Sequence, residues 1–394
     1  MRPMTSADSP VLSLSPLVQA PMAGGPGTPE LAAAVSSAGG LGFLAAGYLS
    51  ADAMLGQLDR AEALTDHPLG VNLFVPERTP DGRLRRLADA DLKRLSRYRE
   101  RLAAELPAAS DGDGRTPAGP APLDTAARPD DDDYPAKLAA LVARPAPPAV
   151  VSFTFGLPTA AELAALRHRG VVTVATVTSE EEALAAVRLG LGGLCVQGPE
   201  AGGHRGTHQC AQTPDPRPLT RLLPDVVAAV RGTEPAAGAR RVWIAAAGGI
   251  ATPGDVARVL RAGADAAQAG SAFLLCREAG TGAAHRSALR ALGAPEDGPE
   301  GDGGTAVTRA FTGRPARGIA NDFLRRHSEA APALYPAVHH LTRPIRAEAA
   351  ASGDRERLHL WAGTRAGLAR EATAAEITAE LLTGTSIASD ITGE

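Results

Sequence analysis

The sequence predicts an α/β fold, a (β/α)8 TIM barrel with an additional C-terminal helical region and a disordered insertion. Eight short apolar runs alternate along the chain with segments of helical pattern. Each run is continuously apolar, as expected for parallel strands that are covered on both faces. A doubly wound open sheet is the structural alternative, because alternation alone does not distinguish a closed sheet from an open one.

The candidate strands follow one another in regular order. They are residues 17–20, 41–46, 69–74, 150–155, 171–177, 193–197, 242–247 and 266–270. Helix starts lie between several of them. Thr28-Pro29 and Thr252-Pro253 place an N-cap before proline, and Thr159 with Glu162 forms a capping box. These starts support the alternation of strands and helices.

Regions outside the strands divide the chain further. We expect the barrel over residues 15–282, a helical extension that packs on it over 283–383, and a flexible tail over 384–394. Residues 108–133 are rich in proline, glycine and aspartate and predict a disordered insertion without a motif. We expect His339 and His340 to lie on a solvated face of the extension.

Composition excludes several classes of function. The chain has 394 residues, 44% of them hydrophobic, and a formal net charge of −4. This balance disfavours a nucleic-acid binder or an anionic-membrane binder. No apolar run reaches the roughly 18 residues of a membrane span, and no basic segment followed by an apolar one opens the chain. We therefore expect a cytoplasmic protein with no membrane and no nucleic-acid partner.

Glycine pairs follow the last two strands. Gly248 and Gly249 follow the seventh strand, and Gly270 and Ser271 close the eighth. Backbone amides at such turns can approach a phosphate closely, and barrels of this class often bind phosphate there. The alternative is a pair of tight turns that need positive φ. We take these four residues as a candidate phosphate cradle.

A histidine lies in the glycine-rich loop after the sixth strand. Gly202 and Gly203 precede His204, and we expect them to leave its imidazole accessible. An unperturbed imidazole titrates at about 6.5, which suits proton abstraction near neutrality. An exposed loop histidine is the alternative. His208 and Cys210 lie nearby, but their spacing matches no zinc signature, so we expect no metal site.

Three amides lie at strand ends on the same rim. Gln19, Asn72 and Gln197 can each donate and accept hydrogen bonds, which suits the polar edge of a heterocycle. Ordinary hydrogen bonding at a barrel rim is the alternative for each. The Met22 thioether either packs against a flat ring or belongs to the core.

Five motifs together resemble the class I nitronate monooxygenases. They are QAPMAGG at 19–25, VNLFVP at 71–76, QGPEAGGHRG at 197–206, AAAGGIATPGDVARVLRAGADAAQAGSAFL at 245–274 and AFTGRPARGIANDF at 310–323. The match spans residues 15 to 365, apart from the insertion. Two departures are Thr364, where the family tends to have glutamine in a WAGQ motif, and Ala269, where a bulkier residue is common.

The resemblance implies a barrel that uses FMN and O2 to oxidise alkyl nitronates to a carbonyl compound and nitrite. It implies that His204 orients a nitronate, or removes the α-proton of a nitroalkane. It also implies a set of cofactor contacts. These are Gln19, Ala20, Pro21 and Met22 at the flavin ring, Asn72, Gln197 and Gly202 beside it, and Gly248, Gly249, Gln268, Ala269, Gly270 and Ser271 at the phosphate arm.

Two other functions stay open at this point. A flavin-dependent NAD(P)H enoyl-acyl carrier protein reductase resembles this chain in its barrel and in the EAGGH loop. A non-catalytic flavin-binding barrel would bind FMN without turnover. The natural nitro compound and the oligomeric state are also open, with a homodimer as the candidate assembly.

Overall fold

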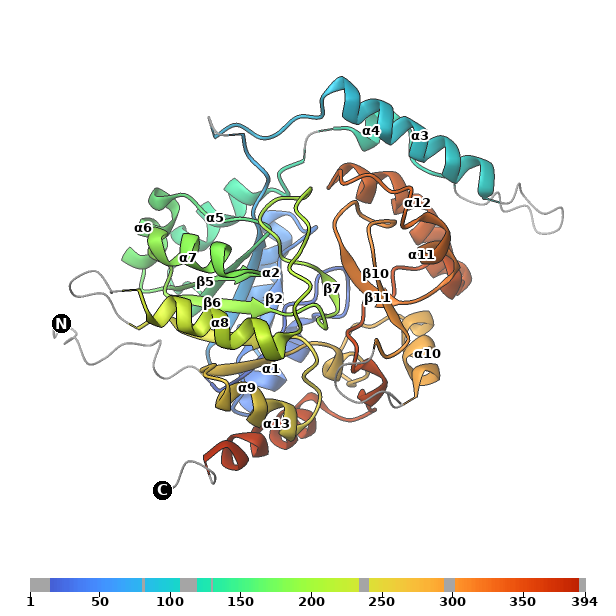
Figure 1. Ribbon diagram of the computed structural model, residues 1–394. Helices are drawn as coiled ribbons and strands as arrows, with labels where there is room; N and C mark the ends of the chain where they lie inside the picture. Colours follow the sequence, from blue (N-terminus) through green and yellow to red (C-terminus); the bar gives the residue numbers. More distant parts are fainter. Residues whose placement is uncertain are drawn as a thin grey trace.

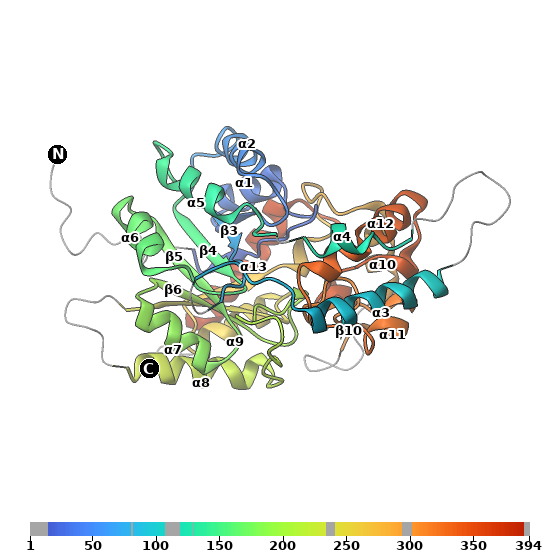
Figure 2. The same cartoon turned by 90° about the horizontal axis from the view of Figure 1, so that it is seen from above.

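The computed structural model describes residues 15–79, 82–106, 119–128, 130–233, 241–293 and 302–389. Eight parallel strands follow one another in the order β1-β9-β8-β6-β5-β4-β3-β2. A parallel bridge between Val18 and Leu41 joins β1 to the start of β2, so the sheet closes on itself. The predicted TIM barrel is confirmed, and Figures 1 and 2 show it beside a second lobe.

The barrel strands begin and end within one or two residues of their predicted bounds. They are β1 Leu17–Gln19, β2 Gly42–Ala45, β3 Leu69–Phe74, β4 Val150–Thr154, β5 Val172–Val177, β6 Gly193–Gln197, β8 Trp243–Ala247 and β9 Ala266–Ala269. Nearly every residue in them is buried, because side chains fill the barrel interior on one face and helices cover the other.

Eight helices surround the strands. They are α1 Pro29–Ser37, α2 Ala51–Glu62, α5 Tyr134–Ala143, α6 Ala160–His168, α7 Glu180–Leu189, α8 Leu219–Arg231, α9 Pro253–Arg261 and α13 Ala374–Ser389. Thr28, Ser50, Thr159, Ser179 and Thr252 cap five of them through their side-chain oxygens. The sequence-level start signals therefore correspond to real helix starts.

The last of these helices changes the predicted domain bounds. Helix α13 packs against α9 and α1, so it completes the ring of helices after a long excursion of the chain. The tail expected from residue 384 is helical to Ser389, and residues 390–394 lie outside the described part. A Cβ at Gly384 would lie 2.2 Å from the Pro253 carbonyl oxygen, so only glycine permits this close helix contact.

The seam between β1 and β2 depends on one amide. The Gln19 backbone N–H donates to Leu41 O at 3.0 Å, and its side-chain Oε1 accepts from Phe43 N at 3.0 Å. Its Nε2 donates to Ala20 O. The Gln19 side chain is completely buried, so these bonds satisfy groups that water does not reach. Gln19 therefore helps to close the barrel.

A second lobe forms from two distant parts of the chain (Figure 1). Helices α3 Asp89–Glu105 and α4 Leu123–Ala126 precede α5, and they lie against α12 Ala337–Ser352. Tyr98, Phe311, Phe323 and Leu341 belong to their shared apolar core. This lobe also contains α10 Ala283–Leu292, α11 Asp322–His327 and two short 3-10 turns, η4 Arg355–Arg357 and η5 Ala366–Leu368. A further 3-10 turn, η2 Ser271–Phe273, follows barrel strand β9.

The prediction of disorder over 108–133 is wrong for the part that the structure describes. Residues 119–128 contain α4, and Asp130, Asp132 and Asp133 make hydrogen bonds to the barrel or to α12. The composition of this segment lacks core residues, but its carboxylates find buried partners such as Lys137, 2.8 Å from Asp132. Residues 107–118 and 129 lie outside the described residues.

The region after the barrel was expected to be helical over 283–383, but it also contains strands. Strands β10 Thr305–Thr308 and β11 Ala316–Ile319 form an antiparallel pair. The two-residue strand β7, Gly203–His204, adds to β11, with His204 opposite Ala316. This small sheet joins the loop after β6 to the second lobe. Among the described residues, no helix is both long and apolar enough to cross a bilayer.

Replacing Gln19 with methionine keeps the side-chain length but removes both side-chain hydrogen bonds, from Phe43 N to Oε1 and from Nε2 to Ala20 O. Because the Phe43 N–H then stays buried without an acceptor, we expect the free energy of unfolding to fall by roughly 1–3 kcal/mol. Chemical denaturation measures this change. Unchanged stability combined with weakened flavin binding would instead assign Gln19 to the cofactor, as the family resemblance implies.

Candidate active site

A cavity of about 1160 Å³ lies between the carboxyl ends of the barrel strands and the second lobe. Loops that follow the strands line one side, and residues of α10, α12 and the 358–365 segment line the other. Most of the predicted site residues meet here. They are Ala20, Pro21, Met22, Asn72, Gln197, Gly202, His204, Gly248, Gly249, Gln268, Gly270 and Ser271.

Two of the predicted residues do not line this cavity. Gln19 is fully buried at the barrel seam described above. Ala269 is 1% exposed and belongs to the barrel core, as the last residue of β9. Both precede lining residues in the chain, and alternate residues of a strand point to opposite faces. A motif match could not separate the lining residues from their neighbours.

The glycine turns after β8 and β9 lie side by side on the cavity wall. Gly248 and Gly249 have φ of +123° and +64°, a conformation that favours glycine. Ser271 begins the turn η2, and its Oγ accepts from Gly363 N at 2.9 Å. Arg365 also lines the cavity, and a Cβ on Gly249 would lie 3.9 Å from its Cδ. A cation therefore accompanies backbone amides where the sequence predicts a phosphate.

The segment Trp361 to Thr364 packs against the turn at Ser271 and against the loop that precedes His204. A Cβ on Gly202 would lie 2.5 Å from Gly363 N, so the two backbones touch at a point where glycine is needed. Thr364 N donates to Glu200 O at 3.1 Å. The Thr364 side chain is buried, and its Oγ1 has no hydrogen-bond partner among the described residues. The segment that departs from the family motif therefore holds the loop before His204 through its backbone.

The amides of the rim are already engaged. Asn72 Nδ2 donates to Ser152 Oγ at 2.9 Å and to Thr154 Oγ1 at 3.0 Å. Gln197 Nε2 donates to His204 O at 2.9 Å, and its Oε1 accepts from Gly206 N at 2.8 Å. Gln197 thus fixes the backbone at the histidine and just after it. The sequence analysis expected these amides to form hydrogen bonds with the polar edge of a heterocycle. Instead, the protein itself supplies their partners.

His204 is held on a strand rather than in an open loop. Its position in β7, opposite Ala316, fixes its backbone. Its Nε2 lies 2.9 Å from Thr312 Oγ1, while Nδ1 has no hydrogen-bond partner within the described residues. The ring centroid lies 5.5 Å from that of Phe155 and 5.4 Å from that of Trp361. The imidazole therefore presents Nδ1 as its remaining hydrogen-bonding atom.

The environment of His204 changes its acidity. Burial, together with the cations Arg314 and Arg346, lowers the pKa of His204 to about 3. This pKa lies well below the value near 6.5 of an unperturbed imidazole. At neutral pH this imidazole carries no charge. It can donate or accept one hydrogen bond, but it is a weak base until an anion binds beside it.

Sequence reasoning missed several residues that line the cavity or lie beside it. Thr312 and Arg314 belong to the AFTGRPARG motif, which was used only as a resemblance. Arg314 and Arg346 are buried, and in the described parts of the chain neither forms an ion pair with a carboxylate. Arg346 Nη2 donates to His339 O at 2.8 Å, and Arg314 Nη1 donates to Thr207 O at 2.8 Å. No local signal separates these arginines from the many others.

The expectation for His339 and His340 is wrong. His339 lines the cavity and stacks on Tyr48, with ring centroids 4.4 Å apart and an interplanar angle of 5°. His340 Nε2 lies 2.9 Å from Asp130 Oδ2. Burial among cations holds the pKa of His339 well below its usual range. Within the described residues, no group of three or more histidine, cysteine or carboxylate side chains is arranged to hold a metal ion.

Known proteins resemble this chain over most of its length. A family model described as nitronate monooxygenase matches residues 6–384. A nitronate monooxygenase of Paraburkholderia phytofirmans is 35% identical, with 94% of this chain and 93% of that protein covered. A probable nitronate monooxygenase of Staphylococcus saprophyticus is 32% identical, with 88% of each chain covered.

Solved structures agree with this assignment. A nitroalkane oxidase of Streptomyces ansochromogenes matches with a TM-score of 0.79 and 40% identity, covering 97% of this chain and 99% of that one. FabK of Thermotoga maritima matches with a TM-score of 0.67 at 22% identity, covering 97% of each chain, which shows a common fold alone. The chain belongs to the nitronate monooxygenase family, a family of flavin-dependent oxidoreductases.

Proposed function

We propose that this protein binds FMN and oxidises alkyl nitronates with O2 to a carbonyl compound and nitrite. The observation that carries the proposal is the position of His204. A neutral imidazole lies on the wall of the cavity, fixed by Thr312, with the buried cations of Arg314 and Arg346 close enough to lower its pKa. Such a wall suits a small organic anion better than a neutral molecule.

The cavity fits a flavin mononucleotide in size and in chemistry. Small-molecule sites commonly measure roughly 300–1,000 Å³, so about 1160 Å³ accommodates a flavin together with a small substrate. Backbone amides at Gly248, Gly249 and Ser271 would hold the phosphate. Arg365, whose Nε lies 3.2 Å from Asp255 Oδ2, would add a cation beside it. Met22 and the Asn72 amide lie on the same wall, where the ring would lie.

Charge beside His204, from Arg346 on the cavity wall and Arg314 behind it, favours the nitronate over its neutral conjugate acid. Arg314 and Arg346 keep their protons at neutral pH, although burial lowers the pKa of Arg346 to about 10. A buried cation without an anionic partner is costly. A bound nitronate would reduce that cost, because its negative charge attracts the arginines. A neutral nitroalkane gains this attraction only after it loses a proton.

His204 then acts as an orienting residue. Its Nδ1 is the ring atom left for the ligand, because Nε2 interacts with Thr312 Oγ1. A nitronate oxygen at Nδ1 would accept a hydrogen bond, and the negative charge would raise the imidazole pKa. With a nitroalkane, the same atom would accept the α-proton. When bound, the flavin supplies the electron-accepting centre for the oxidation, while the chain positions the substrate and excludes water.

The reaction itself is tested with purified protein loaded with FMN. We expect nitrite release from ethylnitronate in air without NADH or NADPH, because the proposed reaction needs O2 and no nicotinamide. Nitrite detection and O2 consumption measure it. Rapid anaerobic bleaching of the flavin by NADPH, with no nitrite from several nitronates, would favour a reductase. Bound flavin without either activity would favour a non-catalytic barrel.

Replacing Arg365 with glutamine tests the phosphate site. The variant loses one cation beside the glycine turns, and a charged hydrogen bond contributes about 1.5–3 kcal/mol. We therefore expect FMN to bind roughly 10–100-fold more weakly. Riboflavin, which has no phosphate, should bind as it does to the unmodified protein. Equal loss of affinity for both flavins would contradict the assignment of the phosphate.

The charge state of His204 predicts a pH profile. Because its pKa is about 3, the imidazole stays neutral from pH 6 to 9. We expect kcat/KM for a preformed nitronate to show no inflection from this group near pH 6.5. Replacing His204 with alanine should lower kcat/KM roughly 10–100-fold through loss of one hydrogen bond to a charged ligand.

Thr312→Val provides the matched control, since it removes the hydroxyl that fixes Nε2 but keeps the imidazole. We expect a smaller loss of kcat/KM in this variant. An inflection near pH 6.5 that disappears in His204→Ala would overturn the assignment of a neutral imidazole. It would instead support a base that titrates at its ordinary value.

A further inference from the structure

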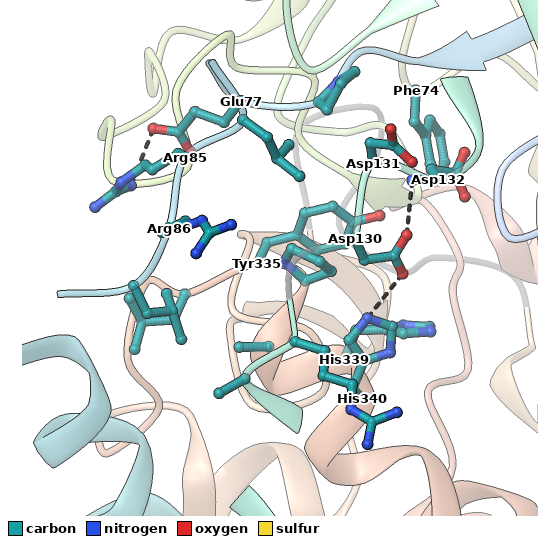
Figure 3. A pocket seen from close by; sticks show the side chains of 18 of the residues that line it. Phe74, Glu77, Arg85, Arg86, Asp130, Asp131, Asp132, Tyr335, His339 and His340 are labelled. Atoms are coloured by element: carbon teal, nitrogen blue, oxygen red, sulfur yellow. Dashed lines mark hydrogen bonds and ion pairs between the residues drawn. The ribbon is translucent and has the colours of Figure 1, made fainter. Parts of the chain in front are cut away.

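A second cavity of about 300 Å³ lies beside the active-site cavity (Figure 3). We call it the side pocket. Leu84, Leu87, Leu92 and Ala127, from the segment between β3 and α5, line one side of it. Leu334 and Tyr335, from the chain before α12, line the other. Of the motifs that carry the resemblance to the family, only VNLFVP at 71–76 reaches into this part of the chain.

A single layer of side chains separates the two cavities. Six residues line both of them, namely Tyr48, Phe74, Asp130, Asp132, His339 and His340. The stacked rings of Tyr48 and His339 form part of this layer. Because each of these side chains contacts both spaces, displacement of one ring would join the side pocket to the active site. We call these six residues the partition.

A run of aromatic rings connects the partition to His204. Ring centroids lie 5.5 Å apart from His204 to Phe155, 4.5 Å from Phe155 to Phe74 and 5.5 Å from Phe74 to Tyr48. Phe155 and Tyr48 have φ of +78° and +69°, which is rare for bulky residues. Backbone strain of this kind gathers at ligand sites, where the surrounding structure maintains it.

The lining of the side pocket favours an apolar occupant. Its carboxylates are engaged with the protein itself. Arg85 donates to Glu77, Asp130 pairs with His340, and Asp132 pairs with Lys137. Asp131 accepts from Asp133 N at 3.1 Å. Arg86 and Arg128 are exposed. The leucines, Val75, Pro76, Ala127 and Pro336 offer a ligand an apolar surface, and burial of that surface is the main force that such a wall can supply.

The inner end of the side pocket has the opposite character. Arg314 lines it, with its guanidinium carbon 4.1 Å from the centre of the Phe155 ring. The same cation lowers the pKa of His204, so its field reaches the active site. A ligand with an anionic head and an apolar tail would therefore fit this arrangement. Its head would lie near His204 and the arginine charges, and its tail would contact the apolar lining of the side pocket.

We propose that the side pocket binds the alkyl tail of the substrate, and that the partition determines which tail lengths enter. The substrate class is then primary alkyl nitronates with a tail longer than the active-site cavity itself accepts. This inference rests on the proposed function, and it assigns the selection of substrate length to the segment between β3 and α5. Tyr48 and His339 act as specificity-determining residues.

The test is a chain-length series with the FMN-loaded enzyme, using ethyl-, butyl-, hexyl- and octylnitronate. We expect kcat/KM to rise about fourfold for each methylene that enters the side pocket. Ala127→Phe fills this pocket and lines no part of the active-site cavity. It should remove the rise for hexyl- and octylnitronate and leave ethylnitronate unchanged within twofold. Leu84→Trp fills the pocket from another side, and we expect it to have the same effect on the three nitronates.

Ala104→Phe is the matched control, because Ala104 is exposed on α3 and lines neither cavity. It should keep the full chain-length dependence. Calorimetric affinities for nitroethane and 1-nitrooctane give a readout that needs no turnover, and Ala127→Phe should weaken only the second. A flat series in the unmodified enzyme, or a filled pocket that leaves octylnitronate unaffected, would overturn the inference. Absence of nitrite from every nitronate would overturn the proposed function, while the affinities would still test the side pocket.

Discussion

The pairing of β7 with β11 is the constraint on which the site depends. The barrel supplies the loop that contains His204, while the second lobe supplies the strand that fixes it, with Ala316 opposite the histidine. Arg205 N donates to Pro315 O at 2.8 Å and continues the same contact. A βα loop of this length would otherwise be mobile. The imidazole is therefore positioned by a sheet that neither part of the chain forms alone.

This constraint also determines the electrostatics. The segment that carries β11 brings Thr312 and Arg314 to the ring, and α12 brings Arg346. Burial removes the water that would screen these charges, so their effect on the imidazole is large. One structural contact thus has two consequences, since it holds the histidine still and keeps it uncharged. A loop histidine exposed to water would have neither property.

Sequence patterns predicted the barrel well because its strands and caps are local features. Continuous apolar runs and N-cap residues such as Thr252 depend on neighbours within a few positions. The twelve lining residues were also predictable, since strand ends share one rim and the motifs mark it. Gln19 and Ala269 were misplaced because a motif does not tell which face of a strand a residue occupies. Arg314, Arg346 and His339 were missed because only tertiary contact distinguishes them.

The segment before α5 shows why composition misleads here. Four consecutive aspartates predict repulsion and disorder, and burial indeed raises the pKa of Asp132 to about 6. Yet Tyr48 N donates to Asp132 Oδ1 and Ala51 N to Asp133 Oδ2, each at 2.7 Å, at the loop before α2 and its first residue. Lys137, one of only two lysines in the chain, is completely buried beside Asp132. These partners lie on the barrel, so the barrel itself holds in place Asp132 and Asp133, which line the active-site cavity.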